Sequence, residues 1–466
     1  MLDKMDLSWN NVPTTILQRI FSQLSIKTRG RCSQVCRHWH YVFWTREPWS
    51  RFVFHDHLLV RRRFTQHSGW QYALDHMRIR IVIPLLIEKW RELIFEPVEN
   101  IFNLYEFIIK LSQFSEHQEK FHHVNPLSYV RKFVFSWKLH VQTNSRRGDT
   151  EEREIGTGGE ILRSLTQLLH NLSGLKRLEI NDLQLDYSDA ERFLQEVLET
   201  YQETLIYLSL MNITKHFYNQ FLHVGLFVNL RYLKISLDLL NASTIELLAD
   251  LKYLKQIVIA QDEKCDETVG YYSYSSQWRS FKARNNNKTQ ITLYMKGKCK
   301  KQMILQPNAP VTTIVWDRSC GQLDEELAEM IISYYATSLK KFIQIGLERF
   351  KRKNDVKNRI DKPLINLFIR CHNLQYLSIR ERMSNGTALI LALLASNRQA
   401  IIHIRENALL KRLSWTRNEI EMLPLPISMK WIQKVSHNYQ HTFSEISNIT
   451  NSSRSLLKDK LYIDYV

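Results

Sequence analysis

The densest group of metal-binding side-chain types in this sequence consists of Cys32, Cys36, His38 and His40. Thiolates and imidazoles are the ligands that tetrahedral Zn²⁺ prefers, so these residues could form a zinc site. The same residues, however, fall within a longer apolar pattern of helical spacing, which favours a structural role. We therefore expect them to be structural and expect no metal site.

Other signatures of chemistry are missing from the sequence. It contains neither the Gly-x-Ser-x-Gly turn of serine hydrolases nor the Gly-x4-Gly-Lys-Ser/Thr loop that cradles phosphates. The stretch GTGGE, residues 156–160, lacks the third glycine of a dinucleotide fingerprint. Cys320 and Cys371 could supply thiols, but nothing marks a base beside either, and a buried cysteine is by default structural. We expect no cofactor and no enzymatic activity, so the function would be positioning.

Composition limits the class of protein and of partner. The chain has 466 residues, is 44% hydrophobic and carries a net charge of +17, which favours an acidic partner, nucleic acid or a membrane surface. Its six scattered cysteines fit a reducing compartment rather than a disulfide scaffold. The opening MLDKMDLSWNN has no apolar run of a secretory signal, and no stretch is long enough to span a bilayer. We expect a cytoplasmic and/or nuclear protein with no membrane partner.

An apolar pattern near the N terminus predicts three short helices. Its positions are Val12, Ile16, Ile20, Phe21 and Leu24, then Cys32, Val35, Cys36 and Trp39, then Tyr41, Val42 and Trp44. The spacing is helical, and Pro13 stands where a first helix would begin. Three helices of this size cannot bury a deep core by themselves. We therefore expect an apolar surface that another protein covers.

This stretch resembles an F-box. Val12-Pro13 corresponds to the family's Leu-Pro pair, VCRHW at Val35–Trp39 to its Val-Cys-Arg/Lys-x-Trp signature, and Trp49 to its closing Trp. The resemblance implies docking on the Skp-type adaptor of SCF ubiquitin ligases and, through it, on a cullin. The residues it assigns to adaptor binding are Val12, Pro13, Ile16, Leu17, Ile20, Phe21, Leu24, Val35, Cys36 and Trp39.

Two departures from the F-box pattern are visible. Val12 replaces the usual Leu, and the helix-two region SIKTRGRCSQ holds Gly30 among basic residues where family members often have acidic or apolar ones. A glycine inside a helix costs about 1 kcal/mol relative to alanine, which would weaken adaptor binding. The alternative interpretation of this region is an unrelated three-helix bundle.

An apolar-x-x-apolar-x-apolar element recurs in the rest of the chain. It starts at Val130, Leu175, Leu205, Leu230, Leu254, Val311, Leu374 and Leu410. The starts between residues 175 and 254 lie 24–30 residues apart, near the period of about 20–29 residues of leucine-rich repeats. Helix-patterned stretches separate them, so each repeat predicts one short strand and one helix.

The predicted fold class is α/β, with a three-helix F-box followed by a curved leucine-rich-repeat-like solenoid. The expected boundaries are an F-box at 7–54, a helical connector at 55–125, the solenoid at 126–430 with an insert at 261–308, and a C-terminal helix and tail at 431–466. This organisation resembles the F-box substrate-receptor family. The segment 408–447, with Ser436 and Tyr439, resembles the end of the F-box only proteins thirty-three and thirty-nine.

In such an array the outward-facing strand residues would form the target-binding face. The residues we assign to it are Arg177, Tyr207, Tyr232, Lys234, Tyr376 and Arg380. Tyr and Arg are favoured at binding hot spots, and the basic balance predicts an acidic or phosphorylated target segment. An ordinary solvated strand surface is the alternative for each residue.

Three functions of different kinds remain open from the sequence. The leading one is a substrate-recognition subunit of an SCF-type ubiquitin ligase, which would promote ubiquitination and degradation of its target. The second is a basic repeat protein that binds nucleic acid, which a steep dependence of affinity on salt would reveal. The third is a scaffold whose N-terminal helices bind something other than the adaptor.

Overall fold

The computed structural model describes residues 9, 12–66, 69–138, 140–144, 150–154, 156–216, 222–265, 273–285, 288–297, 304–317, 322–347, 359–410 and 429–466. The chain divides into two compact units. Unit 1 comprises residues 1–215 with 226–230, and unit 2 comprises residues 216–225 with 231–466. No helix within the described ranges is both long and apolar enough to cross a lipid bilayer.

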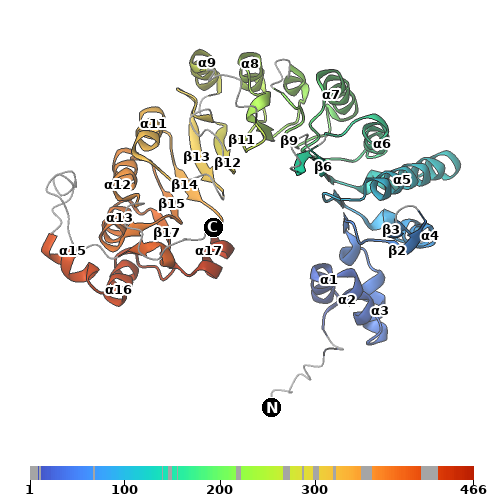
Figure 1. Ribbon diagram of the computed structural model, residues 1–466, viewed down its shortest axis with the longest axis horizontal. Coiled ribbons are helices and arrows are strands. Elements are labelled where there is room, and N and C mark those ends of the chain that lie inside the picture. The colour runs from blue at the N-terminus through green and yellow to red at the C-terminus, as the bar shows by residue number, and fades with distance from the viewer. Residues whose placement is uncertain are drawn as a thin grey trace. The chain divides into compact units, whose positions relative to one another are not determined.

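Unit 1 opens with three short helices that lead directly into a parallel sheet. The helices are α1 (Thr14–Gln23), α2 (Ile26–Cys32) and α3 (Arg37–Trp44), followed by the 3-10 turn η2 (Glu47–Trp49). The strands pair in the order β1 (Arg51–Phe54), β4 (Glu92–Phe95), β5 (Lys132–Ser136), β8 (Arg177–Asn181) and β9 (Tyr207–Met211). Helices α5 (Ile101–His122), α6 (Gly159–His170) and α7 (Tyr187–Tyr201) cover one side of these strands (Figure 1).

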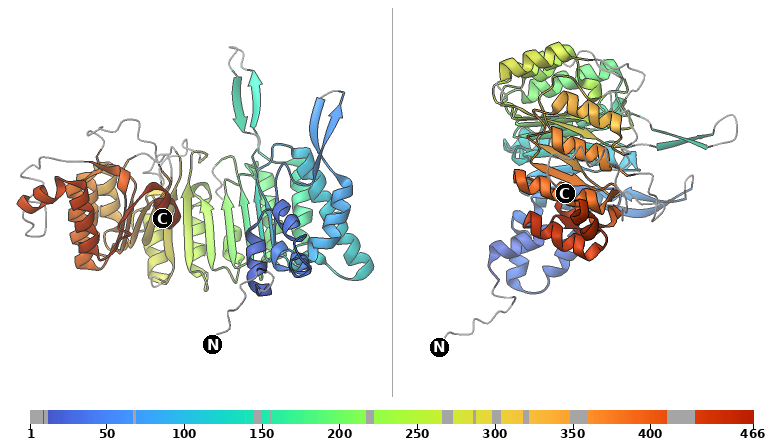
Figure 2. Two further views of the ribbon diagram at one scale, coloured as in Figure 1. Left: turned by 90° about the horizontal axis from the view of Figure 1, so that it is seen from below. Right: turned by 90° about the vertical axis from the view of Figure 1, so that its left-hand side faces the viewer.

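Two antiparallel hairpins interrupt this pattern in unit 1. They are β2 (Val60–Thr65) with β3 (Gly69–Leu74), and β6 (His140–Asn144) with β7 (Thr150–Glu154). Figure 2 shows both hairpins extending away from the sheet. The prediction of a helical connector at 55–125 is therefore wrong in part, because the segment holds β2, β3 and β4 besides α4 (His76–Leu86) and α5. The sequence did not predict β2 because the arginines at 61–63 are exposed on both faces of the strand, so apolar and polar residues do not alternate along it.

Unit 2 repeats the arrangement of a parallel strand followed by a helix. Its strands pair in the order β10 (Tyr232–Ser236), β11 (Gln256–Gln261), β12 (Gln290–Met295), β13 (Val311–Trp316), β14 (Lys341–Gln344), β15 (Tyr376–Ile379), β17 (Ile401–Arg405) and β19 (Leu456–Leu457). Helices α8 (Ala242–Asp250), α9 (Ser275–Asn285), α11 (Glu325–Tyr335), α12 (Asp361–Arg370) and α13 (Asn385–Arg398) lie on one side of them (Figure 1). The two-residue strands β16 (Met383–Ser384) and β18 (Leu409–Leu410) pair separately.

The recurring apolar element forms strands wherever the structure describes it fully. Leu178 and Ile180 on β8, for example, are both buried, as are Leu233 and Ile235 on β10. Residues two apart on a strand point to the same side, so each pair packs under the helices while the residues between them face the other side. The element at 410–415 lies outside the described residues after Leu410, as do residues 411–428 of the segment 408–447.

The predicted insert at 261–308 is not an interruption of the sheet. It contains α9 and β12, and β12 pairs in parallel with both β11 and β13. Ile291 and Leu293 are buried like their equivalents on neighbouring strands. The sequence hid this repeat because α9, SSQWRSFKARN, buries only Trp278, Phe281 and Asn285 and therefore shows little apolar periodicity.

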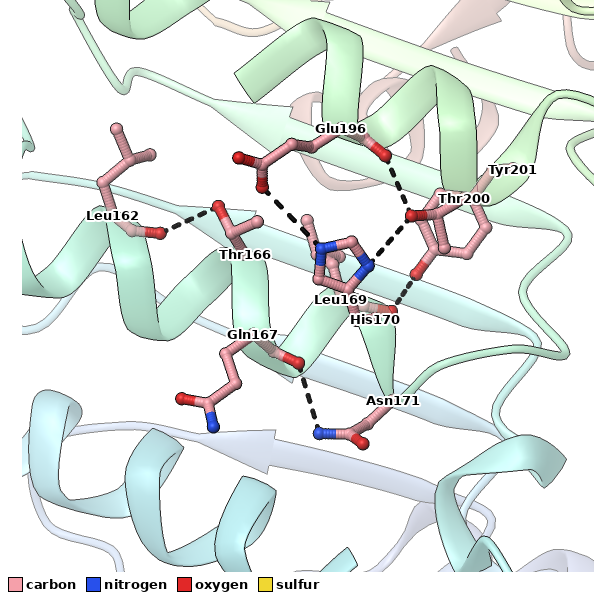
Figure 3. A network of polar contacts seen from close by, with 9 residues as sticks. All are labelled: Leu162, Thr166, Gln167, Leu169, His170, Asn171, Glu196, Thr200 and Tyr201. Carbon is pink, nitrogen blue, oxygen red and sulfur yellow. Dashed lines mark hydrogen bonds and ion pairs between the residues drawn. The ribbon is translucent and has the colours of Figure 1, made fainter. Parts of the chain in front are cut away.

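Polar contacts join the outer helices in unit 1 (Figure 3). The Tyr201 hydroxyl on α7 donates to the carbonyl of Leu169 on α6, and burial raises the pKa of Tyr201. Thr200 lies 3.1 Å from His170 Nδ1, while His170 Nε2 lies 3.8 Å from the Glu196 carboxylate. These contacts link α6 to α7.

The C-terminal residues close the end of the unit 2 sheet. They form α15 (Met429–Ser436), α16 (Tyr439–Thr450), β19 and α17 (Asp459–Tyr465), more structure than the helix and tail predicted for 431–466. Tyr462 of α17 is buried, donates to the Gln344 carbonyl (2.6 Å) and shares a hydrogen bond with the Ser378 hydroxyl (2.8 Å). Ser378 lies between Leu377 and Ile379, so α17 covers the side of β15 opposite to the outer helices (Figure 1).

Replacing Tyr462 with Phe should lower the free energy of unfolding by about 1–3 kcal/mol, because a buried carbonyl and hydroxyl lose their partner. Tyr465→Phe is the matched control, since Tyr465 is exposed, and it should change stability by less than about 0.5 kcal/mol. Urea unfolding followed by tryptophan fluorescence measures both. Equal stability of the two variants would contradict the anchoring role of α17.

Candidate functional site

The three N-terminal helices share a small core. Leu17 and Phe21 on α1 and Val42 on α3 are fully buried. The partly buried residues packed against them are Val12, Leu24, Cys32, Trp39 and Phe43. The rings of Phe21 and Trp39 meet edge to face with centroids 5.6 Å apart. This core uses only one side of α1.

The other side of α1 exposes apolar side chains. Ile16 and Ile20 are 51% and 39% exposed, and they lie one helical turn apart and so on the same face. Pro13 is also exposed, as are Val35 and Ile26. Ile16 and Ile20 contribute nothing to the core of their own domain, which leaves them available to a partner.

Arg29 holds the domain together from inside. Its guanidinium donates to the carbonyls of Leu24 (2.9 Å), Ser22 (3.2 Å) and Pro48, and lies 5.3 Å from the centre of the Trp49 ring. Burial lowers the pKa of Arg29. In the sequence, Arg29 is one of the basic residues by which the helix-two region departs from the F-box pattern. In the structure, its side chain connects the end of α1 to η2. This role could not be predicted from the sequence, because the carbonyls that Arg29 contacts come together only in the folded domain.

Local hydrogen bonds set the ends of the helices. The Ser25 hydroxyl accepts from the backbone N–H of Thr28 (3.2 Å) and caps α2. Cys36 Sγ accepts from the backbone N–H of Trp39 (3.5 Å) and caps α3. His38 Nε2 lies 3.3 Å from the Val12 carbonyl. Among the described residues, no group of three or more Cys, His, Asp or Glu has a metal-binding arrangement.

The structure divides the residues assigned to adaptor binding into three classes by their exposure. Pro13, Ile16, Ile20 and Val35 are exposed, and their contact with a partner stays a prediction. Leu17 and Phe21 are buried, at 1% and 0% exposure, so assigning them to a contact surface is wrong. Val12, Leu24, Cys36 and Trp39 are partly buried, and three of them pack on the core. Adjacent residues of one helix, such as Ile16 and Leu17, thus differ in exposure, since the first faces solvent and the second is in the core.

The domain is joined to the unit 1 sheet without a spacer. The Ser50 carbonyl, directly after η2, accepts from the backbone N–H groups of Arg91 (2.7 Å) and Glu92 (2.9 Å) where β4 begins. Lys89 Nζ donates to the Trp44 carbonyl at the end of α3 (2.8 Å) and lies 5.2 Å from the Trp44 ring centre. These bonds fix the three helices relative to β1 and β4.

The residues assigned to a target-binding face are distributed over both units. In unit 1, Arg177 and Tyr207 are opposite each other in the β8–β9 register, with the guanidinium 3.8 Å from the ring centre. Burial, reinforced by Glu179 and opposed by Arg177, raises the pKa of Tyr207. In unit 2, Tyr232 and Lys234 lie on β10 and Tyr376 lies on β15. Their role in target binding stays a prediction.

Arg380 does not belong on an accessible face. It is 1% exposed and donates to the carbonyls of Ile345 and Asp317, the latter at 3.0 Å. Its own backbone N–H donates to Gln344 Oε1 (3.1 Å). The prediction failed because β15 ends at Ile379, so the strand alternation no longer sets the direction of the next side chain.

Comparison with known proteins agrees with the geometry of the three helices. Residues 9–55 match the F-box-like family. The F-box/LRR-repeat protein 21 of Bos taurus is 42% identical over 48 residues, which is 10% of this chain and 11% of that protein. The chain thus spans about a ninth of the length of this relative. It carries an F-box-like domain at its N terminus.

Replacing Gly30 with Ala should stabilise this domain by about 0.5–1 kcal/mol, since a helical alanine loses less backbone entropy. An added Cβ at Gly30 meets no atom within 4 Å. Gly174→Ala is the opposite control, because its Cβ would lie 2.0 Å from the Ser128 carbonyl oxygen and must displace it. Thermal unfolding should show a higher midpoint for Gly30→Ala and a lower one for Gly174→Ala. A lower midpoint for both would contradict the open surroundings of Gly30.

Proposed function

We propose that this chain is the substrate-recognition subunit of an SCF-type ubiquitin ligase and performs no bond chemistry itself. Its F-box-like domain would bind a Skp-type adaptor and, through it, a cullin. The observation that carries the proposal is the exposed pair Ile16 and Ile20, one turn apart on a helix whose other side already supplies the domain core. Such a face loses contact with water when a partner helix covers it.

The remainder of the chain would hold the target protein. We propose that the strand-and-helix units form a leucine-rich-repeat-like solenoid, in which each unit buries its apolar side against the next. Holding target and ubiquitin-conjugating enzyme in one complex raises their effective concentration, so transfer becomes nearly intramolecular. The bonds from Ser50 and Trp44 to residues 89–92 support this proposal, because a rigid joint keeps the target at a set distance.

Target capture would use the strand side that the outer helices leave open. Arg177, Tyr207, Tyr232 and Lys234 belong to this proposal, together with Tyr376, whereas Arg380 does not. Their chemistry suits an acidic or phosphorylated segment. We further propose a subgroup like the F-box only proteins thirty-three and thirty-nine, proteasomal degradation of the target, and a cytoplasmic and/or nuclear location.

The β2–β3 hairpin favours nucleic-acid binding as a second candidate function. Arg61, Arg62 and Arg63 are exposed on β2, and the exposed rings of Phe64 and Trp70 meet at 5.5 Å. Arginines beside aromatic rings can hold single-stranded nucleic acid. A salt titration separates the two functions, because nucleic-acid affinity falls steeply with salt while an apolar adaptor interface persists.

Replacing Ile16 and Ile20 together with Asp should weaken adaptor binding by roughly a hundredfold or more, because two carboxylates would be buried in an apolar interface. Both side chains are exposed in the free chain, so the variant should fold normally. Titration calorimetry of the full chain with a purified Skp-type adaptor measures the loss, and circular dichroism checks the fold.

The matched control is Thr15→Asp with Arg19→Gln, which changes the charge of α1 equally at exposed polar positions. It should keep wild-type affinity. Failure of the wild-type chain to bind at micromolar concentration, or equal affinity of both variants, would reject the proposed function.

A further inference from the structure

A basic cavity of about 720 Å³ lies in unit 2, where β10, β11 and β12 begin. Its cationic lining is Arg231, Lys252, Lys255 and Lys288, and no Asp or Glu contributes to it. Tyr232 and Tyr253, both exposed, provide aromatic walls. A volume of this size is typical of sites that bind a small ligand or one side chain with its neighbours.

The positive charge of this cavity is not neutralised by the part of the chain that the structure describes. None of the four cations forms an ion pair there, although other surface cations of unit 2 do, such as Lys362 with Glu325 (2.5 Å). Asp250, two residues before Lys252, is already paired with Arg284 at 2.8 Å. Four like charges around one cavity repel one another, and a bound anion would relieve that repulsion.

The backbone holds the lining in place. The Arg231 carbonyl accepts from the backbone N–H groups of Lys255 (2.8 Å) and Gln256 (3.1 Å), and the Lys255 carbonyl accepts from Gln290 (2.8 Å). Tyr232, Gln256 and Gln290 are therefore aligned across the three strands. The register places Arg231 and Lys255 side by side, at the same distance before each strand. The strand register therefore fixes the backbone positions of Arg231 and Lys255, whose side chains are exposed.

We propose that this cavity binds the phosphoserine or phosphothreonine of a target-protein segment. The proposal rests on the proposed function and specifies its target class. A phosphate carries nearly two negative charges and three acceptor oxygens, which several cations can contact at once. The amides of Gln256 and Gln290 and the two tyrosine rings would contact the flanking peptide. A peptide suits the site better than nucleic acid does. A groove that binds nucleic acid has its cations spread along several successive phosphates, whereas the four cations here surround one cavity.

Binding can be tested with three degenerate peptide pools that share one fixed central residue, either phosphoserine, Ser or Asp. Fluorescence anisotropy on the full chain should give saturable binding of the phosphoserine pool, with the other two at least roughly tenfold weaker. Lys252→Gln, Lys255→Gln and Lys288→Gln combined should reduce that affinity by roughly tenfold or more. The control combines Lys282→Gln, Lys296→Gln and Lys460→Gln, exposed lysines outside the cavity, and should bind like wild type.

Adaptor affinity of the triple variant, measured in parallel, separates this inference from the proposed function. Retained adaptor binding with lost phosphopeptide binding supports the inference. No phosphopeptide binding by a wild-type chain that still binds the adaptor overturns the inference alone. The inference is also overturned if a single-stranded oligonucleotide or vesicles with phosphoinositide bind through the three lysines while the phosphoserine pool does not.

Discussion

Helix α1 has apolar side chains on two sides, one packed in the core of its own domain and the other exposed to solvent. The proposed function depends on the exposed side. Leu17 and Phe21 of α1, with Val42 of α3, are the fully buried residues of the core that the three short helices share. Ile16 and Ile20 could not join them, because a helix cannot turn all its side chains to one side. The Arg29 guanidinium adds hydrogen bonds beside this small core, to the carbonyls of Leu24 and Ser22.

The strands in the larger part of the chain also have one buried side and one side that the outer helices do not cover. A parallel strand in either unit buries every second residue under the helices and leaves the others on the opposite side. That opposite side is not uniformly open, because Tyr462 covers Ser378 at the end of unit 2. The strands and the turns before them leave positive charge uncovered at the cavity beside Lys255, which is where we propose that a target binds.

Much of the fold could be predicted from the sequence, because a strand with one buried side has an apolar residue at every second position, as at Leu178 and Ile180. The strand β12 was missed because the polar helix before it does not show an apolar face. At the candidate site, the pattern predicted the helices but not the direction of each side chain. Leu17 and Ile16 are adjacent apolar residues, and only the packing of α1 on α3 decides which is buried. The cavity in unit 2 could not be predicted, because it depends on the register between strands distant in sequence.

The most direct test of the central claim is amide hydrogen exchange of the full chain with and without a saturating Skp-type adaptor. The account predicts slower exchange on binding in α1 and around Val35, with exchange in β10–β12 unchanged. Equal exchange rates throughout residues 12–36 in the presence of bound adaptor would contradict the claim that the exposed side of α1 is the docking surface.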